Sequence, residues 1–168
     1  MPTPKFIVDL RQKIGHDLLL VPTIVVIVSD RHGRILLVHD HDSDYWTLPG
    51  GIIEPGETPA DTAVREVWEE AGVHVRLKRL LGIVGGPGCE TRYSNGDRIA
   101  WVASVFGAEV DEAEPNADGL EARAAAFVSQ ADLPRIKLRD DSRRFLAAAE
   151  EAGEAAYFQA AGWQPDEN

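Results

Sequence analysis

The stretch of sequence that decides the fold runs from residue 51 to residue 73 and reads G-I-I-E-P-G-E-T-P-A-D-T-A-V-R-E-V-W-E-E-A-G-V. It places Glu57 in a loop and three more glutamates, Glu66, Glu69 and Glu70, on the segment that follows. Two carboxylates about 5 Å apart repel each other by roughly 3 kcal/mol at an effective dielectric of about 20. The cluster therefore indicates a site for a positive group, and its all-oxygen donors suit Mg²⁺ or Mn²⁺ better than zinc.

Local signals predict a helix that begins after Thr58 and ends at Gly72. Thr58 suits the N-cap, a proline follows it, and a glycine can adopt the left-handed conformation that ends a helix. Apolar side chains recur at helical spacing and are expected to face the core: Ala60, Ala63, Val64, Val67 and Ala71. The three glutamates are related as i, i+3 and i+4, so we expect them to share another face, turned away from the core. Arg65 precedes Glu69 by four residues and is expected to hold its carboxylate by a forked ion pair.

The spacing of this stretch resembles the Nudix box, G-x5-E-x7-R-E-U-x-E-E-x-G-U, in which U is an apolar residue. Every defined position is filled, in order by Gly51, Glu57, Arg65, Glu66, Val67, Glu69, Glu70, Gly72 and Val73. A chance match at a given start has a probability on the order of one in 10⁸. The alternative is a glutamate-rich helix face exposed to solvent, which does not account for the loop glutamate, the arginine and the bounding glycines.

The resemblance implies the Nudix fold, an α/β fold in which a mixed β-sheet lies between α-helices, and hydrolysis of a phosphoanhydride bond. It implies Glu66, Glu69 and Glu70 as metal ligands, with Glu57 assisting and Arg65 orienting the carboxylates. Residues 46–51, W-T-L-P-G-G, resemble the W-x-L-P-G-G lead-in that is frequent in Nudix hydrolases. In that lead-in the carbonyl of the glycine that matches Gly50 is often a further metal ligand.

The general base varies within the family, so the resemblance leaves it open. Glu69 is one candidate, and an acidic residue after a long predicted strand, residues 98–110, is another. The acidic residues that follow this strand include Glu112, Glu114, Asp118 and Glu121. Of these, Glu121 is the favoured candidate.

Hydrophobic patterning gives the frame around the box. It predicts a short amphipathic helix at residues 6–14, strands at 21–29, 34–39, 73–84, 98–110 and 122–128, and a helix at 140–153. We divide the chain into an N-terminal helical arm (residues 1–20), a Nudix hydrolase domain (21–153) and a C-terminal tail (154–168). The arm could pack on a second subunit, which would make the protein a homodimer.

The composition of the chain limits the classes of molecule that it is expected to bind. The net charge of −11 argues against nucleic acid, which needs a basic surface, but not against a small phosphate ester held through a metal. Cys89 is the only cysteine, so no intrachain disulfide can form. The longest apolar stretch, residues 18–28, is too short to cross a membrane, and no secretory signal is visible. A cytoplasmic location without membrane partners is therefore expected.

The substrate is indicated less sharply. Residues outside the box that could contact it are Arg92, Tyr93, Arg98, Trp101 and His39, through phosphate contacts or base stacking. The proline typical of ADP-ribose hydrolases falls at Cys89, and the tyrosine typical of dinucleoside-polyphosphate hydrolases falls at Glu90 or Thr91. His39 begins a polar run, His39-Asp40-His41-Asp42, which could be a second metal or base-contact site or a polar strand end.

Three functional hypotheses follow from the sequence. The first is hydrolysis of a small nucleoside diphosphate derivative, in which the diphosphate is linked to another moiety, as in ADP-ribose or another nucleotide sugar. The second is a (d)NTP pyrophosphohydrolase that removes unwanted nucleotides and releases pyrophosphate. The third, from a different class, is a non-catalytic Nudix-like ligand-binding domain, which usually has an eroded box, whereas this box is intact.

Overall fold

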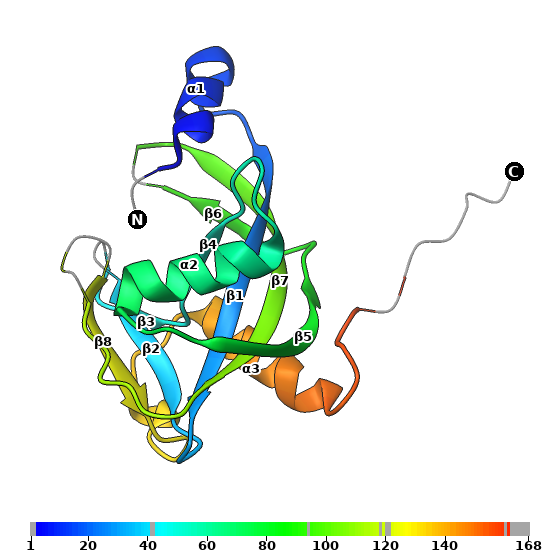
Figure 1. Cartoon of the computed structure of the whole chain (residues 1–168). Helices are drawn as coiled ribbons and strands as arrows, with labels where there is room; N and C mark the ends of the chain where they lie inside the picture. The colour runs from blue at the N-terminus through cyan, green and yellow to red at the C-terminus, as the bar shows by residue number, and fades with distance from the viewer. Residues whose placement is uncertain are drawn as a thin grey trace, which may run out of the picture.

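A mixed β-sheet organises the chain in a computed structural model that describes residues 3–40, 43–93, 95–117, 119, 122–159 and 161 (Figure 1). The elements of the described residues are α1 (Lys5–Ile14), β1 (Leu19–Asp30), β2 (Ile35–Asp40), β3 (Trp46–Thr47), β4 (Gly50–Ile52), α2 (Pro59–Ala71), β5 (Arg76–Val84), β6 (Glu90–Arg92), β7 (Arg98–Val110), β8 (Ala122–Val128), η1 (Leu133–Arg135) and α3 (Asp140–Ala152). The strands follow the order β3-β2-β1-β7-β5, while β4 pairs with β1, β6 with β7 and β8 with β2.

The centre of the sheet is a long parallel pair. β1 and β7 run together from the Leu19–Ile99 pair to the Asp30–Val110 pair, whereas the other recorded strand pairings are antiparallel. Parallel strands are normally covered on both faces, and the apolar run of β1 fits that position. The predicted strands at 98–110 and 122–128 are confirmed with the same bounds. The strand predicted to start at residue 73 starts at Arg76, because Val73 enters the core directly after the α2 cap.

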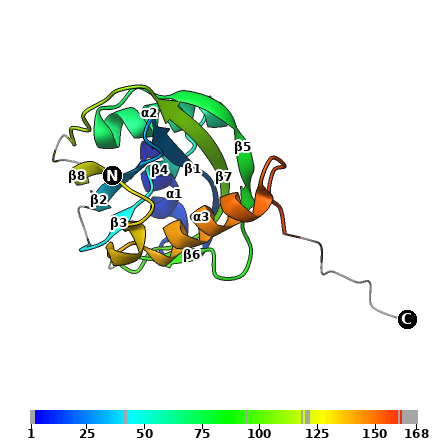
Figure 2. The ribbon, with the colours of Figure 1, turned by 90° about the horizontal axis from the view of Figure 1, so that it is seen from below.

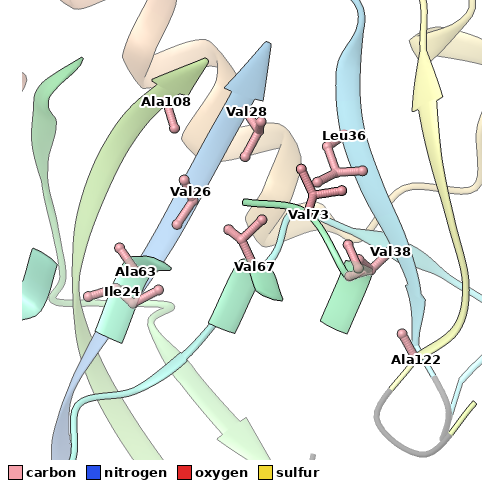
Figure 3. Close-up of a cluster of buried hydrophobic side chains, with 11 residues drawn as sticks. Ile24, Val26, Val28, Leu36, Val38, Ala63, Val67, Val73, Ala108 and Ala122 are labelled. Carbon is pink, nitrogen blue, oxygen red and sulfur yellow. The ribbon is translucent and has the colours of Figure 1, made fainter. Parts of the chain in front are cut away.

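Helices α2 and α3 cover opposite faces of the sheet, as Figure 2 shows. Under α2, Val67 packs with Val26 of β1 and Leu36 of β2 in one buried cluster (Figure 3). Under α3, Phe145 packs with Leu81 of β5 and Val105 of β7 in a second cluster. The predicted α/β fold, a mixed sheet between helices, is therefore confirmed.

The predicted N-terminal helix is also confirmed, as α1. Its side chain Ile7 is buried with Val21 and Ile99, so α1 packs on β1 and β7 of its own chain. Contact of this arm with a second subunit stays a prediction. Among the described residues, no helix is long and apolar enough to span a membrane.

The free edge of β5 is partly closed by the segment that follows α3. Tyr157 donates its N–H to the carbonyl of Leu81 at 2.7 Å and accepts from the N–H of Ile83 at 3.0 Å. Gly82 lies between these two residues, and a Cβ at that position would come within 2.6 Å of the Tyr157 carbonyl oxygen. Glycine at position 82 therefore lets the C-terminal segment pair with the sheet edge.

We expect Gly82→Ala to release this segment, because the added Cβ cannot coexist with the Tyr157 backbone. Losing the two bonds should lower the free energy of unfolding by about 1–2 kcal/mol. Hydrogen exchange should show faster exchange of the Ile83 N–H than in wild type. Gly85→Ala is the matched control, since the three atoms nearest to its Cβ all belong to the side chain of Val102. Equal protection of Ile83 in both variants would contradict the prediction.

Candidate active site

Arg65 is the hub of the acidic cluster. Its Nε and Nη2 donate to the two oxygens of Glu57 at 2.7 and 2.9 Å. Its Nη1 donates to Glu66 Oε1 at 3.0 Å and to Glu69 Oε2 at 2.8 Å. The prediction that Arg65 holds Glu69 is confirmed as a single bond, but the forked pair forms with Glu57 instead. Glu57 comes from a loop and can present both oxygens, whereas Glu69, on the same helix turn, reaches Arg65 with one.

Glu57 is fixed in this geometry by the start of the helix. Its Oε2 accepts from the hydroxyl of Thr62 at 2.8 Å and from the N–H of Glu54 at 3.1 Å. The hydrogen bonds from Arg65 are the main reason that the pKa of Glu57 falls to about 2, although its partial burial opposes the shift. The same contacts raise the pKa of Arg65. Glu57 and Arg65 are therefore a permanently charged pair near neutral pH.

Two of the helix glutamates are buried, which corrects the prediction that all three face away from the core. Glu66 is 1% exposed and Glu70 is 8% exposed, whereas the predicted core residue Ala60 is exposed. The reason is that α2 contacts β4 as well as β1, so the acidic flank of the helix is covered too. Glu69 remains accessible, with 39% of its side chain exposed. Of the three helix glutamates, one is thus open to solvent and two are enclosed.

Gly50 connects β4 to this buried flank. Its N–H donates to Glu70 Oε2 at 3.0 Å. A Cβ at position 50 would come within 2.3 Å of the carbonyl oxygen of Ile24. Only glycine allows this close approach of β4 to β1, and the approach in turn places the Gly50 backbone against the glutamate.

Acid stability gives a test of the Glu57–Arg65 pair. A folded-state pKa of about 2 lies below the ordinary value of 4.5, so the pair contributes fully above about pH 4.5 and is lost as the pH falls toward 2. Its contribution should be on the order of 1 kcal/mol, because solvent screens a partly exposed pair. We expect Glu57→Gln to be less stable than wild type at neutral pH and to lose less stability in acid.

Urea unfolding in EDTA at about pH 7 and about pH 3 measures this difference. Glu150→Gln, on the exposed side of α3, is the control and should follow the wild-type curve. Identical acid dependence in wild type and Glu57→Gln would show that the pair does not act on stability.

The donor set fits a hard divalent cation. Within the described residues, no three Asp, Glu, His or Cys side chains converge on one point as metal ligands, since Glu57, Glu66 and Glu69 converge on Arg65. Four carboxylates against one guanidinium still leave three negative charges, and every donor is an oxygen. That composition matches Mg²⁺ or Mn²⁺ and offers no nitrogen or sulfur ligand to zinc.

The candidate substrate residues at positions 92–98 lie together on one hairpin. Arg92 of β6 is directly opposite Arg98 of β7, and both side chains are exposed. Tyr93 follows β6 and is half exposed, and burial of its hydroxyl raises its pKa. Trp101 lies further along β7, where its ring packs against Phe145 with centroids 5.6 Å apart. Arg92, Tyr93 and Arg98 therefore share one exposed surface, whereas Trp101 is partly buried against the hydrophobic core.

His39 lies near the end of β2, one residue before Asp40. Its ring contacts the Trp46 ring edge-on with centroids 5.1 Å apart, and only 17% of the side chain is exposed. Asp40, next to it, lies 3.6 Å from Arg139, which the sequence did not single out. His41, Asp42, Asp118 and Glu121, the favoured general base, fall outside the described residues.

Sequence patterns also missed the support behind Gly50. Ser142, in the first turn of α3, accepts from the Leu48 N–H at 3.1 Å and bonds the Thr47 hydroxyl at 2.9 Å. These contacts fasten the segment that leads to Gly50 onto α3. Apart from the position of a serine near a helix start, no local pattern indicates a partner so far away in sequence.

Comparisons with known proteins agree with this geometry. The family model described as NUDIX domain matches residues 19–149. A "Putative 8-oxo-dGTP diphosphatase" of Bacillus subtilis is 31% identical over 119 residues, which cover 71% of this chain and 73% of the relative. An "ADP-ribose pyrophosphatase" of Methanocaldococcus jannaschii is 29% identical over 136 residues, or 79% of this chain and 76% of the relative. The crystal structure of a MutT protein from Methanosarcina mazei Go1 has the same fold, with a TM-score of 0.66, 22% identity, and coverage of 82% of this chain and 98% of that one.

Proposed function

Because the chain belongs to the Nudix family and is a hydrolase acting on acid anhydrides, we propose that it cleaves the phosphoanhydride of a nucleoside diphosphate linked to another moiety, such as ADP-ribose or another nucleotide sugar. The observation that carries the proposal is the cluster of four glutamates, three of them bonded to Arg65 and the fourth to Gly50. The similarity to a named ADP-ribose pyrophosphatase over 79% of the chain supports this class of substrate.

Hydrolases of this family generally use divalent metal ions. In our proposal Glu66, Glu69 and Glu70, with Glu57 and the Gly50 carbonyl, would hold Mg²⁺ or Mn²⁺, which supplies charge neutralisation and Lewis-acid polarisation of the diphosphate. The protein groups fix this donor set in advance. Arg65 orients three carboxylates, and the Gly50 N–H orients the fourth.

Proton transfer from the attacking water needs an accessible base. Glu69 fits this role, because it is the most exposed carboxylate of the cluster and Arg65 fixes one of its oxygens at 2.8 Å. Glu121 is the second candidate. For the substrate, Arg92 and Arg98 offer exposed guanidinium groups to phosphate, and the exposed ring of Tyr93 offers a face to a base. Roles for Trp101 and His39 stay predictions.

A second candidate function is pyrophosphohydrolysis of a (d)NTP. The relative named as a putative 8-oxo-dGTP diphosphatase favours it. The two functions differ in their products, since a (d)NTP would release pyrophosphate and a nucleotide sugar would release two monophosphates. A binding domain without turnover is not favoured, because every residue of the box is present.

The deciding experiment incubates the purified protein with Mg²⁺ and a panel of ADP-ribose, other nucleotide sugars, dinucleoside polyphosphates and (d)NTPs, and separates the products by chromatography. We expect wild type to cleave a nucleotide sugar and Glu69→Gln to be nearly inactive. Release of pyrophosphate from (d)NTPs alone would select the second function. Cleavage of no compound, despite measurable binding of Mg²⁺, would support the binding domain and overturn both hydrolytic proposals.

The remaining expectations from the sequence stay predictions. They are the cytoplasmic location, the homodimer and the division of the chain at residues 20 and 153.

A further inference from the structure

Helix α1 lies outside residues 19–149, which match the family model, yet it bonds the β6–β7 turn and shares a buried cluster with β4. We propose that α1 is a built-in positioning element for the substrate, in which Arg11 holds the β6–β7 turn in a fixed place relative to β4. The inference rests on the proposed function in one respect, that the β6–β7 hairpin contacts the substrate. Figure 1 shows α1 at the end of the sheet where β4 and β6 lie.

Arg11 fastens the helix to the turn. Its Nη2 donates to the carbonyl of Arg98 at 2.7 Å, and its Nε lies 3.5 Å from Asp97 Oδ1. Its Nη1 donates to the carbonyls of Gly15 at 3.1 Å and Asp17 at 2.6 Å, directly after α1. Only 11% of the side chain is exposed. Because the guanidinium group is planar and rigid, its bonds to both segments hold the end of α1 and the start of β7 in a fixed relative position.

Asp97 connects Arg11 to the other residues of the turn through its own hydrogen bonds. Its Oδ1 lies 2.8 Å from His16 Nδ1, and its carbonyl accepts from the Tyr93 N–H at 2.9 Å. The Asn95 side chain bonds the Asp97 backbone N–H at 3.0 Å, which closes the turn from inside. The half-exposed Tyr93 is therefore held through Asp97 by residues from the N-terminal arm.

Helix α1 is also linked to the acidic cluster, through Ile52 of β4. Phe6 of α1 and Ile52 of β4 both pack against the small buried cluster of Ile7, Val21 and Ile99, so the helix shares this cluster with β4 two residues after Gly50. The carbonyl of Ile52 also accepts from Arg65 Nη2 at 3.5 Å. One helix thus shares a buried cluster with the strand beside the candidate metal ligands and bonds the turn that carries candidate substrate contacts.

A rigid spacer of this kind acts on substrate affinity more than on the chemical step. If Arg11 is removed, the turn must be ordered again when substrate binds, and that cost appears in binding. The glutamate cluster does not contact Arg11, so bond cleavage in the bound complex should change little. A merely stabilising helix would instead lower the melting temperature and the active fraction without changing KM.

Initial-rate kinetics on the best substrate of the panel test the proposal with Arg11→Ala, Arg11→Lys, His16→Ala and the control Lys13→Ala, an exposed residue on the same helix. We expect KM to rise about 10-fold in Arg11→Ala with kcat within about 2-fold of wild type. Arg11→Lys should recover part of the affinity, His16→Ala should raise KM about 2-fold, and Lys13→Ala should match wild type. An unchanged KM in Arg11→Ala, or a fall in kcat alone, would overturn the inference.

Hydrogen exchange supplies a readout that needs no substrate. The Tyr93 N–H should exchange faster in Arg11→Ala than in wild type or Lys13→Ala, because its acceptor Asp97 is no longer held. Equal exchange of the Tyr93 N–H in all three proteins would show that Arg11 does not hold the turn in place, and would overturn the inference. Faster exchange in Arg11→Ala, together with a wild-type protein that cleaves no compound of the panel, would instead show that the proposed function is wrong while the restraint on the turn is real.

Discussion

Glu70→Gln is expected to remove most of the hydrolysis while leaving the fold intact. Glu70 is buried, and its Oε2 accepts from the Gly50 N–H at 3.0 Å. Glutamine has the same shape and keeps an oxygen to accept that bond, but it removes a negative charge that a divalent cation needs. We expect kcat/KM to fall by at least about 100-fold and Tm to change by no more than about 3 °C.

The control for this variant is Glu151→Gln, at an exposed position of α3. It makes the same chemical change outside the cluster and should keep wild-type activity. Near wild-type turnover in both Glu70→Gln and Glu69→Gln would show that the glutamate cluster is not needed for hydrolysis. An equal loss in Glu151→Gln would show that net charge, and not position, is responsible.

Helix α2 could be predicted from the sequence because its limits are set by neighbouring residues. Thr58 caps it by accepting from the Asp61 N–H at 3.1 Å, and Gly72 ends it with a φ of 65°. Long strands such as β7 were equally visible, since their patterns repeat over many residues. The short strands β3, β4 and β6 have too few residues to show a period, and their pairing with longer strands defines them.

The arrangement of the cluster could be predicted only in part. Spacing places Glu66, Glu69 and Glu70 on neighbouring positions of one helix, and the structure agrees. Whether that flank is covered depends on β4, which a Gly50 contact with β1 brings to the helix. Spacing along the helix carries no information about this, so burial of two of the glutamates was missed.

Contacts between distant segments account for the other gaps. Arg11 donates to the carbonyl of Arg98, 87 residues further along the chain. Ser142 supports Leu48 across a separation of 94 residues. Each depends on the whole sheet being assembled, and neither an arginine in an amphipathic helix nor a serine near a helix start is unusual. Only the family resemblance gave the function before the fold was known, because the box combines residue types that local structure does not require.

Arg65→Ala is expected to be the most destabilising single change in the cluster. Arg65 donates to Glu57, Glu66 and Glu69, and Glu66 is almost fully buried. Removing the guanidinium leaves these carboxylates without their shared positive partner, at a cost of about 3 kcal/mol in the free energy of unfolding. Urea unfolding in EDTA measures this loss.

Mg²⁺ should restore part of the stability of Arg65→Ala, because a divalent cation supplies positive charge to the same carboxylates. The stabilisation by Mg²⁺ should therefore be larger in Arg65→Ala than in wild type. Arg135→Ala is the control, since Arg135 forms a largely exposed ion pair with Asp132 and its loss should cost less than about 1 kcal/mol. If Arg65→Ala were as stable as wild type in EDTA, the guanidinium could not be what holds the carboxylates together. If it lost stability but gained none from Mg²⁺, the glutamates would be a structural network, and the metal would have to bind elsewhere.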